Sequence, residues 1–168
     1  MKHFYMKQKV FSFRDRYKVF DEEQNVVFHC EGKVFSISRQ MKFIETSTGN
    51  ILYHFRRKVF SFMPTYYLYD QEEKQIAVVK RKFSFLRPKV NIESDLGNMT
   101  IDGDYFGHNF TLMENDSEVA SVTKKWISWG DSYEISIFDE SKTHFLLSIV
   151  ILIDSIFHEN SSRNRIRI

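Results

Sequence analysis

One stretch of this chain is apolar on every side. Residues 145–157 read FLLSIVILIDSIF, and only Ser148, Asp154 and Ser155 are polar among them. As a helix, a segment of this length spans about 20 Å, which is well short of the ~30 Å hydrocarbon core of a bilayer. A helix that is apolar all round has to be surrounded by protein. The rest of the fold must therefore supply a wall that encloses it.

A repeated phrase predicts what this wall is made of. The sequence KVFSF at 9–13 returns in related form at 33–37, 58–62, 82–85 and 125–129, and the first four copies start 24, 25 and 24 residues apart. Two strands of five or six residues, together with their turns, occupy about 24 residues. Each period therefore predicts one β-hairpin.

Three copies of the phrase also continue alike. A tyrosine follows the opening lysine by eight positions, as Tyr17, Tyr66 and Tyr133, and an acidic turn comes next. This shared order indicates a duplication rather than chance in a chain rich in Phe and Lys. Further short runs between turn residues bring the total to about a dozen strands, and no amphipathic helix separates them.

The apolar helix and the repeated hairpins together predict one architecture. A closed antiparallel barrel of about twelve strands has an interior wide enough for a helix of about 10 Å diameter. We therefore predict an α+β, mainly β domain over residues 1–160, with a central helix at about 142–159 and a basic tail at 161–168. Asp139 or Ser141 can cap the start of the helix. The alternative is a β-rich domain with a short membrane anchor.

The composition excludes several classes of function. With 24 Lys+Arg against 22 Asp+Glu, the net charge is +2, which is far from that of a dedicated nucleic-acid-binding domain. Cys30 is the single cysteine, so an intramolecular disulfide is excluded and a reducing compartment is favoured. The first residues lack the apolar run of a secretion signal, and we expect a cytoplasmic protein.

The sequence contains no recognisable catalytic or metal-binding motif. We expect a non-enzymatic protein without a metal or other cofactor. Residues 102–104 and 114–116 are acidic, but Phe106 stands where a calcium-binding EF-hand loop needs an oxygen ligand, so we interpret both segments as hairpin turns. Asp154 lies one helical turn before His158, which predicts a structural pair.

Four segments resemble the bacterial branch of the LURP-one-related family: MKQKVFSF at 6–13, KRKFSFLRPKVNIE at 80–93, KKWISWGDSYEI at 124–135 and SIVILIDSIFHE at 148–159. The resemblance covers nearly the whole chain. It implies the tubby-like fold, a twelve-stranded antiparallel barrel around a central hydrophobic helix. The ending ILIDSIFHE is also similar to that of phospholipid scramblases, although the acidic calcium loop of those proteins is not matched. Tubby domains bind phosphoinositide headgroups, so the resemblance implies a role at lipids.

The lysines that open the phrases predict a basic rim, because one hairpin per period returns each lysine to the same end of the barrel. Each Lys or Arg close to an anionic membrane contributes about 1 kcal/mol. Trp126 and Trp129 beside one cluster suit a membrane interface. Alternatively, the lysines keep strand edges soluble and the Trp rings lie in the core. The candidate lipid-binding residues are Arg56, Arg57, Lys58, Lys80, Arg81, Lys82, Lys124 and Lys125.

Two functional hypotheses follow. The first is a cytoplasmic or peripheral membrane domain that binds anionic phospholipid headgroups, or a protein partner, through the basic rim. The second is a scramblase-like activity on phospholipids. A barrel for small ligands is disfavoured because the helix should fill the interior, and the sequence does not indicate an oligomeric state.

Overall fold

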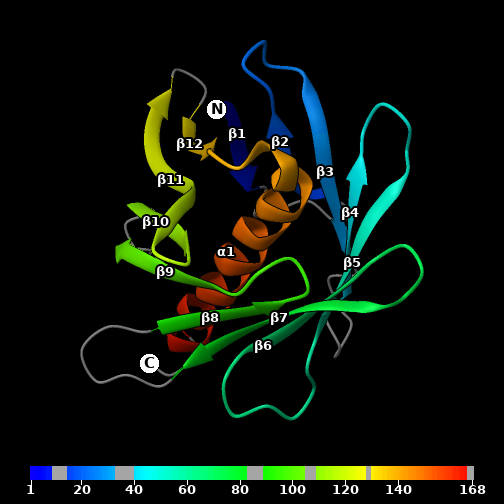
Figure 1. Cartoon of the computed structure of the whole chain (residues 1–168), viewed down its shortest axis with the longest axis vertical. Helices are drawn as coiled ribbons and strands as arrows, with labels where there is room; N and C mark the ends of the chain where they lie inside the picture. Colours follow the sequence, from blue (N-terminus) through cyan, green and yellow to red (C-terminus); the bar gives the residue numbers. More distant parts are fainter. Residues whose placement is uncertain (9–14, 33–39, 83–88, 105–108, 128–129, 166–168) are drawn as a thin grey trace.

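The computed structural model describes residues 1–8, 15–32, 40–82, 89–104, 109–127 and 130–165, and within these the side chains outside 8, 15–16, 125–127, 130–131 and 158–165. Twelve antiparallel strands in the described part of the chain form one closed barrel, in which each strand pairs with its neighbours in sequence and β1 pairs with β12 (Figure 1). The predicted barrel and its strand number are confirmed.

The strands are β1 (Lys2–Gln8), β2 (Asp15–Phe20), β3 (Val26–Gly32), β4 (Gln40–Glu45), β5 (Ile51–Arg57), β6 (Thr65–Tyr69), β7 (Gln75–Lys82), β8 (Lys89–Ser94), β9 (Met99–Asp104), β10 (Asn109–Glu114), β11 (Ser117–Ile127) and β12 (Gly130–Ile137). Their side chains alternate between the two faces of the sheet. In β8, for example, Val90 and Ile92 are buried while Lys89 is exposed.

The helix α1 (Thr143–Arg165) runs through the middle of the barrel, after a short 3-10 turn η1 (Glu140–Lys142) (Figure 1). Leu147, Ile151 and Ile153 are fully buried in the core that the strands surround. Within the described residues, no helix has both the length and the apolar content needed to cross a bilayer. The side chain of Asp139 accepts a hydrogen bond from the backbone N–H of Ser141, so the predicted cap is present at η1.

The helix ends later than the sequence predicts. It continues through residues 160–162 to Arg165, whereas the predicted end was 159. Asn and Ser cost under about 1 kcal/mol each in a helix, and no Gly or Pro follows to stop the turn that is already formed. The predicted basic tail is therefore partly helical.

The barrel has two different ends. At the turn end, short turns at 21–25, 46–50, 70–74, 95–98 and 115–116 lead from even-numbered to odd-numbered strands, and α1 begins there. At the loop end, the odd-numbered strands finish, and the chain reaches the next strand through connections such as 58–64. In Figure 1, α1 passes from its orange start near β12 to its red end near β7 and β8.

The duplicated tyrosines occupy equivalent places. Tyr17, Tyr66 and Tyr133 are all buried and lie near the starts of β2, β6 and β12, at the loop end. The interpretation of 102–104 as a turn is wrong, because these residues belong to β9. Gly103, at φ +110°, allows the backbone of β10 to approach closely, and an added Cβ would lie 2.7 Å from the carbonyl oxygen of Asn109. Residues 115–116 do form a turn, with φ of 48° and 63°.

Candidate functional site

The loop end brings several of the predicted basic residues to one side of the molecule. Lys58 follows β5 directly, Lys82 ends β7, and Lys124 lies near the end of β11. These strands run in the same direction around an antiparallel barrel, so their last residues share one end. Lys9 and Lys33 lie outside the described residues, and so do the side chains of Lys125, Trp126 and Trp129.

Most of the described cations of this end lie on three strands, β5, β7 and β8, or directly after β5. We call this group the basic sector: Arg57, Lys58, Lys80, Arg81, Lys82 and Lys89. Strand pairing places these residues close together. Lys82 lies opposite Lys89, and Lys80 lies opposite Thr65, which follows the connection that begins with Lys58. The four lysines are exposed.

In the described part of the chain, the rest of the loop end is more mixed in charge. Lys124 lies on β11, separated from the basic sector by β9 and β10. The carboxylates Glu31 and Asp104 stand near the ends of β3 and β9. Among the described residues, the basic sector is therefore the main group of positive charges at this end, and the full rim stays a prediction because Lys9, Lys33 and the side chain of Lys125 lie outside those residues.

Arg81 differs from the lysines because it points inward. It continues the inner face of β7 after Ala77 and Val79, and its guanidinium carbon lies 5.9 Å from the centre of the Phe157 ring at the end of α1. Its Nε is buried and has no hydrogen-bond partner among the described residues. Arg57 continues the inner face of β5 after Phe55 in the same way. Two guanidinium groups thus border the interior at this end.

Arg56 is not part of this arrangement. It lies on the outer face of β5, where it forms an ion pair with Glu73, and its guanidinium carbon lies 4.5 Å from the centre of the Tyr69 ring. Its charge is therefore balanced on the side wall of the barrel. The structure separates this candidate from the basic sector.

The connection from β5 to β6, residues 58–64, carries two exposed phenylalanines. Phe60 has a relative exposure of 102% and Phe62 of 96%. The backbone of the connection is nevertheless held at both ends, because the N–H of Lys58 donates to the carbonyl of Thr65 at 2.8 Å and the N–H of Arg81 donates to the carbonyl of Pro64 at 3.1 Å. The basic sector therefore forms the base from which both rings project.

The backbone of this loop is unfavourable for its sequence. Phe60 has φ +54°, in the left-handed region that bulky residues avoid, at a cost of roughly 1–3 kcal/mol. The hydroxyl of Ser61 donates to the carbonyl of Met63, and that of Thr65 donates to the same carbonyl at 3.1 Å. These bonds stabilise a conformation that leaves the aromatic rings in water.

Asp154 is hydrogen-bonded to Tyr17, a partner that the sequence does not predict. The hydroxyl of Tyr17, on β2, donates to Oδ2 of Asp154 at 2.9 Å and lies 2.9 Å from the hydroxyl of Ser155. All three residues are buried. This contact ties α1 to the wall of the barrel, which agrees with a structural role. The predicted partner His158 has its side chain outside the described residues.

Comparisons with known proteins agree with this fold. A family model described as LURP-one-related matches residues 2–154. The protein named "Uncharacterized protein YxjI" of Bacillus subtilis is 33% identical over 160 residues, which cover 95% of this chain and 96% of that protein. The X-ray structure of the Arabidopsis thaliana protein AT5G01750 superposes with a TM-score of 0.66 at 16% identity, covering 92% of this chain and 91% of that one. This likeness concerns the fold alone, and the predicted tubby-like barrel is confirmed. The chain therefore belongs to the LURP-one-related family.

Proposed function

We propose that this protein is a non-enzymatic module that docks on anionic phospholipid surfaces with its loop end. The observation that supports this most strongly is the pair of fully exposed rings, Phe60 and Phe62, on a loop whose base is the basic sector. Exposed aromatic rings beside clustered lysines match the chemistry of an anionic membrane interface, which is apolar below its charged headgroups.

The energies of the two contributions are comparable. Each Lys or Arg near an anionic surface contributes about 1 kcal/mol, and full burial of a Phe side chain contributes about 1.5–3 kcal/mol. Neither contribution alone gives stable anchoring, because peripheral attachment to membranes usually needs two signals. The loop end carries both, with the lysines mainly on β7 and β8 and the rings in the β5–β6 connection.

We also propose an orientation for the docked protein. The rings would enter the lipid, the four exposed lysines would face the headgroups, and the C-terminal end of α1 would point toward the membrane. Arg81, with a buried Nε that has no hydrogen-bond partner among the described residues, suits a phosphate oxygen of a headgroup because guanidinium groups bind phosphate in a planar, bidentate manner.

Co-sedimentation with vesicles tests the proposal. We expect binding at low salt to phosphatidylcholine vesicles that contain phosphatidylserine or a phosphoinositide, and little binding to phosphatidylcholine alone. The double variant Lys80→Glu/Lys82→Glu should weaken binding at least about 30-fold, which corresponds to two lost contacts of about 1 kcal/mol each. Both lysines lie on the outside of β7, so the variant leaves the interior intact.

A matched control reverses two lysines at the opposite end, in the variant Lys2→Glu/Lys74→Glu. Both lysines form exposed ion pairs, with Glu140 and Asp95, which contribute little to stability. The control changes the net charge by the same amount and should retain binding. Equal weakening by both variants would contradict docking through the loop end, and an absence of binding by the wild type would leave a protein partner as the ligand of the basic sector.

The same vesicles distinguish docking from the scramblase-like alternative. In a dithionite assay on labelled lipid with calcium, the docking proposal predicts no transbilayer movement of lipid above background. Lipid movement that the Lys80→Glu/Lys82→Glu variant abolishes would replace the proposed function by a scramblase-like one.

A further inference from the structure

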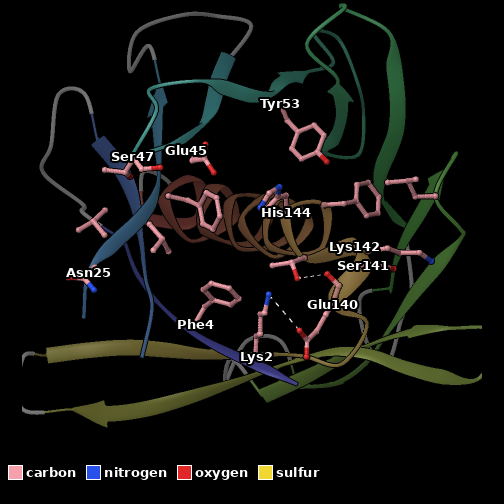
Figure 2. A pocket seen from close by; sticks show the side chains of 17 residues that line it. Lys2, Phe4, Asn25, Glu45, Ser47, Tyr53, Glu140, Ser141, Lys142 and His144 are labelled. Atoms are coloured by element: carbon pink, nitrogen blue, oxygen red, sulfur yellow. Dashed lines mark hydrogen bonds and ion pairs between the residues drawn. The ribbon is translucent and has the colours of Figure 1, made fainter. Parts of the chain in front are cut away.

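The turn end contains a hollow of about 600 Å³ that the docking proposal does not use (Figure 2). Cavities of roughly 300–1,000 Å³ that are mostly apolar and hold a few polar groups are typical of small-molecule sites. Its walls come from β1, β3, the β4–β5 turn, β5 and the first residues of α1. Strands thus extend beyond the start of the helix and leave a recess above it.

η1 is tethered to one side of the recess, and the opposite side is open. Lys142 binds Glu114 at the end of β10, with 2.6 Å between Nζ and Oε2, and Glu140 binds the amino terminus and Lys2 at the start of β1. These ion pairs hold the chain between β12 and α1 against one part of the barrel mouth. The side formed by β3, β4 and β5 remains uncovered.

Aromatic rings form much of the uncovered wall. The rings of Phe28 and His144 meet edge to face with centroids 5.1 Å apart, and the ring of Tyr53 is stacked at 6.3 Å on that of Phe43, which is fully buried. Figure 2 shows Tyr53, Glu45 and His144 on one side of the hollow and Phe4, Lys2 and Glu140 on the other. The faces of Phe and Tyr rings carry negative electrostatic potential and attract cations.

The charges around the hollow favour a positive ligand. Its two lysines, Lys2 and Lys142, are already held by carboxylates. Glu45 lies in the wall, and a smaller hollow of about 390 Å³ that shares Tyr53 and His144 reaches Asp70 and Glu72 in the β6–β7 turn. Burial, together with the negative charge of Asp70, raises the pKa of Tyr53.

We propose that this hollow binds a small aromatic molecule that carries a positive charge, with its ring against Phe28, Tyr53 and His144 and its ammonium group toward Glu45, Asp70 and Glu72. The site is independent of lipid docking, since it lies at the opposite end of the barrel. It also differs from a ligand site inside the barrel, because α1 fills the interior below it.

Three probes of similar shape test this assignment by NMR titration of the isotope-labelled protein: tryptamine, which is cationic, tryptophol, which is neutral, and indole-3-acetate, which is anionic. Tryptamine should bind at least about fivefold more tightly than tryptophol, and indole-3-acetate should bind most weakly. The perturbed resonances should belong to His144 and to the turns at 46–50 and 70–74.

Variants separate the charge from the aromatic wall. Glu72 is exposed, and Glu72→Lys should weaken tryptamine about fivefold or more while leaving tryptophol almost unchanged. Tyr53→Leu should weaken both probes. Glu93→Lys, on the exposed face of β8 away from the hollow, makes the same change in net charge and should have no effect.

Several results would overturn the proposal: equal affinity for the three probes, perturbations that lie outside the turn end, or equal effects of Glu72→Lys and Glu93→Lys. If the Tyr53→Leu variant did not fold, the comparison of Glu72→Lys with Glu93→Lys would still test the proposed site. No vesicles are present in these titrations, so their outcome does not depend on the lipid experiments.

Discussion

At the turn end of the barrel, the connections are short, and the two lysines that flank the start of α1 are neutralised by Glu140, Glu114 and Asp139. At the loop end, four exposed lysines and two exposed phenylalanines lie on β7, on β8 and in the β5–β6 connection. The same twelve strands build both ends, so the difference comes from the residues placed at each end: Lys80, Lys82 and Lys89 on β7 and β8, and Lys58, Phe60 and Phe62 in the β5–β6 connection. The repeat KVFSF marks one end only, since each copy begins at or beside the end of an odd-numbered strand.

The largest expected effect concerns how α1 is held at each end. At the loop end, Tyr17→Phe removes a buried hydrogen bond to the carboxylate of Asp154, and we expect a loss of about 1.5–3 kcal/mol in the free energy of unfolding. At the turn end, Asp139→Ala removes a partly exposed cap and should cost about 1 kcal/mol. Urea unfolding of both variants measures the difference. A smaller loss for Tyr17→Phe than for Asp139→Ala would show that the helix is anchored mainly at the turn end.

The second prediction separates the rings from the lysines within the loop end. The variant Phe60→Ser/Phe62→Ser should bind anionic vesicles about tenfold or more weakly, and its remaining binding should disappear as salt rises, because only screened charge interactions are left. The control Leu96→Ser/Phe138→Ser removes two partly exposed apolar residues at the turn end and should bind like the wild type. If vesicle binding by the wild type and by Phe60→Ser/Phe62→Ser fell equally as salt rises, the rings would not enter the lipid.

The smallest effect is a pH dependence at the turn end. The hydroxyl and backbone N–H of Ser141, together with Lys142, hold the pKa of Asp139 below its ordinary value of 3.8. The charged form is therefore favoured by folding, and this stabilisation is present above the ordinary pKa and is lost as the pH falls through the lowered one.

The variant Asp139→Asn, which keeps the cap but not the charge, isolates this contribution. We expect the wild type to exceed the variant by about 0.3–1 kcal/mol near neutral pH and to equal it in strong acid. Urea unfolding at a series of pH values between 7 and about 2.5 would measure the gap. A gap that stays constant over this range would contradict the assigned role of Asp139.

The architecture could be predicted from two patterns in the sequence, and the individual side-chain contacts could not. The 24-residue period and the apolar helix specify barrel and core, because only enclosure satisfies residues 145–157. Tyr17 could not be assigned to Asp154, since their contact joins residues that are 137 positions apart. The ion pair of Arg56 with Glu73 depends on strand register, which the sequence pattern leaves open.

The loop at 58–64 shows a further limit of the pattern. Its alternation of Phe with polar residues is typical of a strand with one buried face, yet both rings are exposed. The available signal was Pro64, which cannot donate a ladder hydrogen bond and thus opposes a continuous strand. Composition alone therefore does not distinguish a ring in the core from one that is available to a membrane.

The most direct test of the account places a fluorophore at each end. Cys30 is buried, and burial raises the pKa of its thiol, so a new surface cysteine can be labelled selectively. An environment-sensitive dye on Phe62→Cys should shift to shorter wavelength when phosphatidylserine vesicles are added, while the same dye on Leu96→Cys should not. Vesicle binding without a shift at position 62, or with an equal shift at position 96, would contradict docking through the loop end.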